Sequence, residues 1–159
     1  MIEQIPYLRI FEGFLFHFDK FRPFLFTLLK LRGIEKLPGL RPAVKVIARS
    51  RDQLRRHLQS LESQLEKGGG PWILGDQFTL ADVSWTVIFE RLRQADCEDV
   101  FLAKEDRPHV AAYWARLRAR PAYAEAILGH SHPFIEYGRE RIAEAKAMNA
   151  DLRVCLEGR

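Results

Sequence analysis

A helix-start motif within residues 75–83 constrains the fold of this chain more than any other feature of its sequence. Thr79 is a favourable N-cap residue, and its hydroxyl can accept the amide of Asp82 while the Asp82 carboxylate accepts the amide of Thr79. Phe78 and Val83 are spaced as the hydrophobic staple that often accompanies such a capping box. The motif predicts a helix that starts at Thr79, with a structural role for these four residues.

The segment after Thr79 is apolar on nearly every side, which predicts a buried central helix. Its apolar residues are Leu80, Ala81, Val83, Trp85, Val87, Ile88, Phe89 and Leu92. Asp82 would then be a largely buried carboxylate, stabilised by backbone amides and by the positive end of the helix dipole.

The remaining segments also show a hydrophobic period near 3.6 residues, which predicts an all-α bundle. We expect helices over residues 7–28, where Pro23 bends or splits the segment, and over 43–67 and 134–152. Residues 96–106 should hold a short turn or helix, and shorter helices should start at Pro108 and run from Pro121 to Gly129. Three glycines at 68–70 followed by Pro71 end the second of these helices. We expect one helical domain over 1–132, with an amphipathic helix and tail over 133–159 packed on it or extending from it.

Arg51 interrupts the apolar stripe of the helix over 43–67, at a position where the pattern asks for an aliphatic residue. A guanidinium there could snorkel past the edge of the core, form an ion pair, or face a ligand. A basic group on the same helix could meet an anionic ligand from a neighbouring domain or simply be solvated; it comprises Lys45, Arg49, Arg55, Arg56 and His57.

Composition argues against several classes of protein. The net charge of +4 is concentrated in residues 1–60, which hold 12 Lys and Arg against 5 acidic residues, yet no nucleic-acid-binding motif accompanies it. The uncharged stretches are too short to span a bilayer, and no secretory signal is present. We therefore expect a cytoplasmic protein that binds neither nucleic acid nor membrane, with Cys97 and Cys155 as reduced thiols.

Motifs for catalysis or metal binding are missing from the sequence. His130 and His132 lack a third ligand nearby, no Gly-x-Ser-x-Gly elbow occurs, and the adjacent Glu98 and Asp99 stand in a polar surface stretch. We expect no metal, no cofactor and no catalytic residue in this chain.

Together, these motifs resemble the C-terminal helical domain of the glutathione transferase superfamily. The family signature matches Gly75, Phe78, Thr79, Leu80, Ala81 and Asp82, and downstream Arg107-Pro108, Trp114 and Arg120-Pro121. The resemblance covers about residues 42–132. Pro71-Trp72, Ser84 and Leu128-Gly129-His130 look most like the branch of ganglioside-induced differentiation-associated proteins and their bacterial relatives.

The resemblance implies a glutathione transferase C-terminal-like bundle from a parent that transfers glutathione to a small electrophile or reduces it. Family members bind this co-substrate with an N-terminal thioredoxin-like domain, and nothing matching it precedes Met1, so we expect the chain alone to be inactive. The family's first helix lines the electrophile site. Phe11, Phe14, Phe18 and Phe21 would take that role, unless their stripe is simply core.

Surplus aromatic residues off that stripe, namely Phe16, Phe24 and Phe26, imply a covering partner. This would be a thioredoxin-like domain or a second subunit, and we expect a homodimer. A hypothesis from a different class is a stand-alone protein–protein interaction module without catalysis, since similar domains serve assembly in some translation factors and synthetases.

Overall fold

A computed structural model describes residues 33–130 and 133–158 of the 159-residue chain. The described residues form helices joined by turns, which confirms the all-α prediction. Among them, β-type pairing is limited to two isolated bridges in the 72–77 turn. The elements are η1 (Ile34–Gly39), α3 (Arg41–Lys67), α4 (Leu80–Gln94), α5 (Glu98–Phe101), α6 (Pro108–Arg118), α7 (Pro121–Ala126), η2 (Leu128–His130), α8 (Pro133–Met148) and α9 (Ala150–Glu157).

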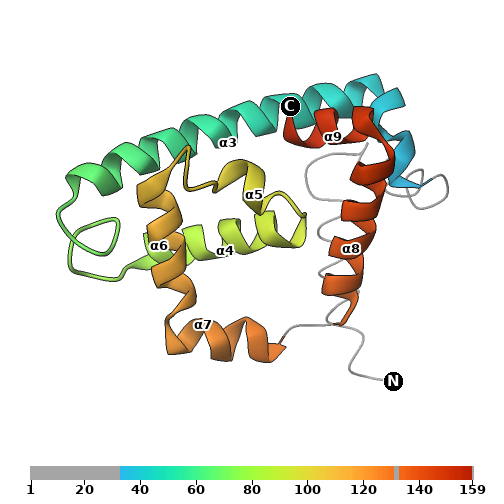
Figure 1. The fold of residues 1–159 in the computed structure, drawn as a ribbon. Helices are drawn as coiled ribbons and strands as arrows, with labels where there is room; N and C mark the ends of the chain where they lie inside the picture. Colours follow the sequence, from blue (N-terminus) through green and yellow to red (C-terminus); the bar gives the residue numbers. More distant parts are fainter. Residues whose placement is uncertain (1–32, 131–132, 159) are drawn as a thin grey trace.

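The long helix α3 organises the arrangement (Figure 1). The helices α6 and α8 descend on either side of α4, and α9 turns back to lie along α3. No helix in the described part of the chain is long and apolar enough to cross a membrane.

Local sequence explains where most of these helices begin and end. Gly69, just past the end of α3, has φ 64°, a left-handed conformation that glycine adopts without a steric penalty. Pro108 and Pro121 each occupy the first position of a helix, as predicted, because a proline there sacrifices no helical hydrogen bond.

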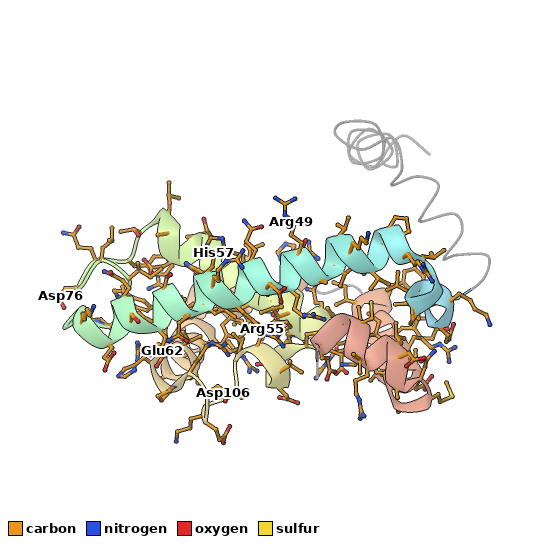
Figure 2. All side chains as sticks on the ribbon, turned by 90° about the horizontal axis from the view of Figure 1, so that it is seen from above. Arg49, Arg55, His57, Glu62, Asp76 and Asp106 are labelled. Carbon is orange, nitrogen blue, oxygen red and sulfur yellow. The ribbon has the colours of Figure 1, made fainter. Side chains whose placement is uncertain are left out.

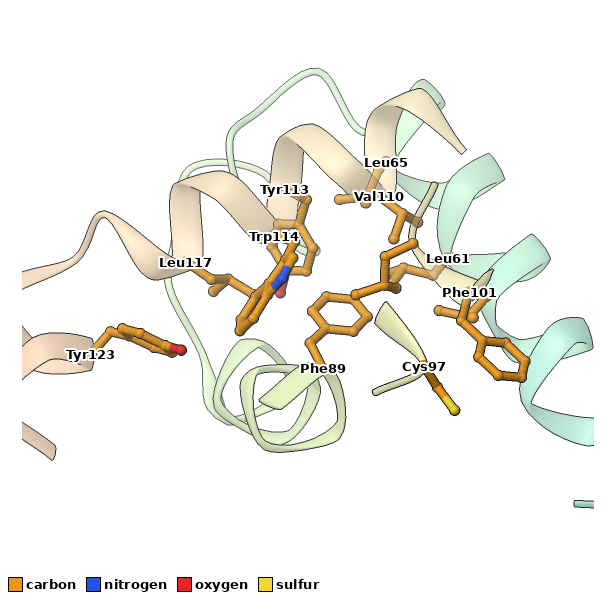
Figure 3. Close-up of a cluster of buried hydrophobic side chains, with 12 residues drawn as sticks. Leu61, Leu65, Phe89, Cys97, Phe101, Val110, Tyr113, Trp114, Leu117 and Tyr123 are labelled. Atoms are coloured by element: carbon orange, nitrogen blue, oxygen red, sulfur yellow. The ribbon is translucent and has the colours of Figure 1, made fainter. Parts of the chain in front are cut away.

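The main core lies between α3, α4 and α6, with Phe89 of α4 at its centre (Figure 3). The Phe89 ring packs edge to face against Tyr113 and Trp114 of α6 at centroid distances of 6.1 and 5.4 Å, an arrangement that aromatic quadrupoles favour. A second buried cluster joins η1 and the start of α3 to α8 and α9; it comprises Leu37, Ala43, Ala145, Leu152 and Cys155.

The prediction of one continuous helix over 134–152 is wrong. The segment divides at Asn149, whose side chain accepts the amide of Leu152 at 3.0 Å and so caps α9. Asn149 also donates to the carbonyl of Glu35 in η1. Because the break redirects the chain, Leu152 and Cys155 reach the second cluster.

Arg51 donates to backbone carbonyls of α9 and also lies 3.7 Å from the carboxylate of Asp52. Its Nη1 donates to the carbonyls of Val154 and Cys155 at 3.1 and 3.0 Å, near the C-terminal end of α9. Gly158 closes that end with φ 77°, and a Cβ there would lie 2.7 Å from the Arg51 guanidinium. The misplaced arginine of the α3 stripe is therefore a structural link between α3 and α9.

Lys146 of α8 forms a second structural link, to Glu157 of α9 and to Asp96 in the turn that follows α4. Its Nζ lies 2.7 Å from Oδ2 of Asp96 and 2.8 Å from Oε1 of Glu157, and it also donates to the Asp96 carbonyl. The side chain is buried, and a buried ammonium needs this pairing to offset the loss of its hydration.

Candidate functional site

Asp82 accepts hydrogen bonds from several segments at the start of α4. Its Oδ2 accepts the amide and the hydroxyl of Thr79 at 2.8 and 3.0 Å, and the capping box is confirmed. Its Oδ1 accepts the amide of Ile73 at 3.1 Å and the hydroxyl of Tyr113 at 2.7 Å. The carboxylate thus joins the 72–77 turn, α4 and α6.

Asp82 is fully buried, as expected. Burial by itself would raise its pKa, but the hydrogen bonds from Thr79, Tyr113 and Ile73 outweigh that effect and hold the pKa below the usual value for aspartate. All of these donors favour the ionised form, so Asp82 is suited to a structural role and not to acting as a general acid.

The prediction that α4 is buried on all sides is wrong. Leu80 is 82% exposed and Val87 51%, and Val83 and Ile88 are also exposed. Only Asp82, Phe89 and Glu90 of this helix are buried. The helices α5, α6 and α8 pack against other parts of α4, so among the described residues the side that carries Leu80 and Ile88 has no covering helix.

Beside this exposed face lies a hollow of about 260 Å³ between α4 and α7, called here the α4–α7 hollow. Its walls include Phe78, Val83, Thr86, Arg120, Tyr123 and Ile127. Phe78 and Val83, expected to form the hydrophobic staple, both line it.

Arg120 lies over the Phe78 ring, with its guanidinium carbon 3.6 Å from the ring centroid and 5.1 Å from that of Trp72. Such stacking holds the planar guanidinium by its face and leaves its N–H edge available. The hollow therefore combines apolar walls with one oriented cation.

Glu90 forms a buried polar network behind the α4–α7 hollow. Its two oxygens share the Arg93 Nε–H at 3.1 Å, and Oε1 also accepts from Arg93 Nη2 at 2.9 Å. Its Oε2 accepts the Tyr123 hydroxyl at 2.7 Å. Burial would raise the pKa of Glu90, but these donors hold it below the usual value. Burial and the Glu90 hydrogen bond raise the pKa of Tyr123 to about 12. Arg93 continues the network to Glu136 of α8 at 2.9 Å.

The other candidate residues have mostly structural surroundings. Phe11, Phe14, Phe18 and Phe21 lie outside the described residues, as do Phe16, Phe24, Phe26 and His132. Glu98 accepts the Trp114 indole N–H at 2.7 Å. Cys97 and Cys155 are free and buried, and burial raises the pKa of each thiol. Within 33–130 and 133–158 no cluster of ligating side chains could hold a metal ion.

The basic group on α3 divides in two. Lys45, Arg49, Arg56 and His57 are exposed, and Arg49 projects away from the ribbon in Figure 2. Arg55 instead donates to the Glu157 carbonyl at 2.5 Å and lies 5.7 Å from the Phe101 ring centroid. Four members of the group are therefore exposed to solvent or to a neighbouring domain, while the fifth anchors α9.

Arg120 and Glu90 are two of the residues at this site to which the sequence interpretation gave no role; Thr86, Tyr123 and Ile127 are others. Arg120 was noted only as part of an Arg-Pro pair before a helix. Glu90 could have been found from its position, because it is an acidic residue beside Phe89 in an otherwise apolar helix, and such a residue requires buried partners.

The sequence of this chain is similar to glutathione S-transferases. Residues 45–116 match the family model described as glutathione S-transferase, C-terminal domain. The chain is 36% identical over 81 residues to glutathione S-transferase TCHQD of Arabidopsis thaliana, which is 51% of this chain and 29% of the relative. It is 27% identical over 114 residues to glutathione S-transferase F14 of the same plant, covering 72% and 44%.

A bacterial relative is the 2,5-dichlorohydroquinone reductive dechlorinase of Sphingobium indicum. It is 38% identical over 68 residues, which cover 43% of this chain and 20% of the relative. The chain therefore spans less than half the length of each of these relatives. No solved structure gives a significant match.

Proposed function

We propose that this chain is the helical half of a glutathione-dependent protein, because residues 45–116 match the family model for the glutathione S-transferase C-terminal domain. The parent would transfer glutathione to a small apolar electrophile or reduce the electrophile with it. Glutathione would be the co-substrate and would bind to a thioredoxin-like domain, while this domain would contribute to the electrophile site and to dimerisation.

The observation that best supports this function is that the family motif forms the structural centre of the domain. Asp82 joins the capping box to the 72–77 turn and to α6 through Tyr113. Identity to a reductive dechlorinase as well as to transferases supports both conjugation and reduction as parent chemistry.

The exposed face of α4 supports a covering partner. Leu80 and Ile88 stand on it, and contiguous exposed apolar side chains on a folded domain commonly mark an interface. The relatives extend well beyond the matched region, which favours a thioredoxin-like domain as the covering structure and a second subunit as the other candidate.

Glutathione consumption by the purified 159-residue chain tests the enzymatic part of the proposal. With 1-chloro-2,4-dinitrobenzene or a chlorinated hydroquinone as electrophile, we expect no turnover by the chain alone. We expect turnover from the gene product that contains any in-frame thioredoxin-like segment. Turnover by the chain alone, or none by the longer product with a panel of electrophiles, would contradict this function.

A second candidate function is a protein–protein interaction module without catalysis, which the exposed α4 face also favours. A genuine translation start at Met1, together with a stable complex containing a different protein, would support it. Substitution of Leu80 by Lys should weaken that complex, whereas a Lys in place of exposed Gln59 of α3 should not.

Light scattering tests the proposed homodimer. We expect a dimer at tens of micromolar, and a clean monomer at that concentration would contradict the dimer. Membership of the ganglioside-induced differentiation-associated branch and a cytoplasmic location stay predictions, and phylogenetic placement and cell fractionation test them.

A further inference from the structure

The α4–α7 hollow has a chemical character that the proposed function does not use. It is almost entirely apolar, and its volume of about 260 Å³ exceeds the roughly 150 Å³ of a cavity known to hold benzene. A single aromatic ring with one substituent fits this size, whereas the larger ligands that fill most binding pockets do not.

Two of the three polar side chains named in its walls already have hydrogen-bond acceptors for their hydroxyl protons. The Thr86 hydroxyl donates to the Asp82 carbonyl at 2.8 Å, and the Tyr123 hydroxyl donates to Glu90 at 2.7 Å. A ligand in the hollow would therefore find one strong donor group, the guanidinium of Arg120.

Arg120 differs from the neighbouring arginines in its partners. Arg116 donates to the Pro71 carbonyl at 3.1 Å, and Arg118 lies 3.7 Å from Oε1 of Glu98. Within the described part of the chain, no carboxylate or carbonyl accepts from the Arg120 side chain, whose recorded contacts are the rings of Phe78 and Trp72. Stacking pre-organises this donor fork for a planar, two-oxygen anion.

We propose that the α4–α7 hollow binds a small aromatic carboxylate. The ring lies against Val83 and Ile127, and the carboxylate receives hydrogen bonds from Arg120. The site uses none of the residues expected to line the electrophile site. It borders the exposed face of α4 on the side away from Ile88, because Val83 and Thr86 lie on the opposite flank of the helix from Ile88.

Benzoate is a suitable probe, and benzyl alcohol is its neutral match. A methyl NMR titration of the 159-residue chain should show benzoate shifting resonances of Val83, Ala122 and Ile127. Benzyl alcohol should bind about tenfold or more weakly, because a charge-assisted hydrogen bond contributes roughly a factor of ten or more in affinity.

Two variants decide between this site and non-specific binding. Arg120→Gln should weaken benzoate binding about tenfold and remove the preference over benzyl alcohol, while Arg118→Gln, a matched loss of charge, should leave both affinities unchanged.

Ala122→Leu, which keeps Arg120 and fills the hollow, should abolish binding of both probes, and it decides the matter if Arg120→Gln fails to fold. Equal affinity for the two probes, shifts confined to other methyl groups, or undiminished binding by Ala122→Leu would overturn the proposal.

Discussion

Glu62, in the middle of α3, caps the first turn of α6 through Val110, which lies 48 residues further along the chain. Its Oε2 accepts the Val110 amide at 2.8 Å, and its Oε1 accepts the amide of His109 at 3.0 Å. Glu62 lies on the side of α3 that faces α6 (Figure 2). Since the first amides of a helix have no partner within it, α6 depends on a different helix for its capping.

We expect Glu62→Gln to lower the free energy of unfolding by about 2 kcal/mol, because it replaces a carboxylate oxygen with a donor that faces a buried amide. Amide exchange at His109 and Val110 should accelerate before exchange at Phe89. Glu66→Gln, the same change at an exposed position one turn later, should leave both exchange rates unchanged. Equal effects of the two substitutions would contradict the capping role.

Asp82→Ala should cost about 3 kcal/mol, because it leaves the buried amides of Thr79 and Ile73 and the hydroxyl of Tyr113 without their acceptor. Tyr113→Phe removes one donor and should cost about 1 kcal/mol. Urea unfolding of both variants measures the difference. An unchanged midpoint for Asp82→Ala would rule out Asp82 as a structural centre.

Lys146→Met should destabilise the chain by about 3 kcal/mol, since it leaves the carboxylates of Asp96 and Glu157 without their shared cation. Adding Glu157→Gln should recover part of that loss, because one of the two uncompensated charges is then removed. A double-mutant cycle on thermal unfolding measures this coupling, and strictly additive effects would show that the pair does not interact.

Stability should fall as the pH drops below about 4.5, the ordinary value for a glutamate side chain. Burial opposes ionisation of Glu62, Asp82 and Glu90, but hydrogen bonds outweigh it and hold each pKa below its usual value. A carboxyl group with a lower pKa in the folded state stabilises the fold above its unfolded pKa. That stabilisation disappears as the pH falls through the folded pKa.

Urea unfolding at pH 3, 4, 5 and 6 measures this dependence. Asp82→Asn cannot titrate at this position, so its stability should change less steeply with pH than that of the parent chain. Parallel curves for the two proteins would show that the Asp82 pKa is the same in the folded and unfolded states.

Features determined by neighbouring residues were predictable from sequence. The capping box at Thr79, the helix starts at Pro108 and Pro121, and the glycine end of α3 each depend on a few consecutive residues. Asp82 is buried as predicted, but that prediction was based on a helix covered on every side, which the exposure of Leu80 and Val87 contradicts.

Features that depend on distant partners were not predictable. The role of Arg51 requires the carbonyl groups of α9, about a hundred residues later, and hydrophobic periodicity carries no information about such a contact. The exposure of Leu80 had a different cause: an apolar helix indicates that a surface can be covered, but not whether the covering residues belong to the same domain. The α4–α7 hollow likewise arises where α4 meets the segment around α7, a geometry that local sequence does not specify.

The Glu90 network has a consequence for chimeric proteins in which this helical domain is exchanged. The family match ends at residue 116, but Glu90 inside it is held by Tyr123, and Arg93 extends the same network to Glu136. A recombination junction at residue 116 would keep Glu90 but replace the segment that carries Tyr123 and Glu136. The buried Glu90 carboxylate would then face a foreign segment that was not selected to pair with it. Junctions placed after α9 would transfer the acid together with its partners, so exchanges of that larger block should yield soluble hybrids more often.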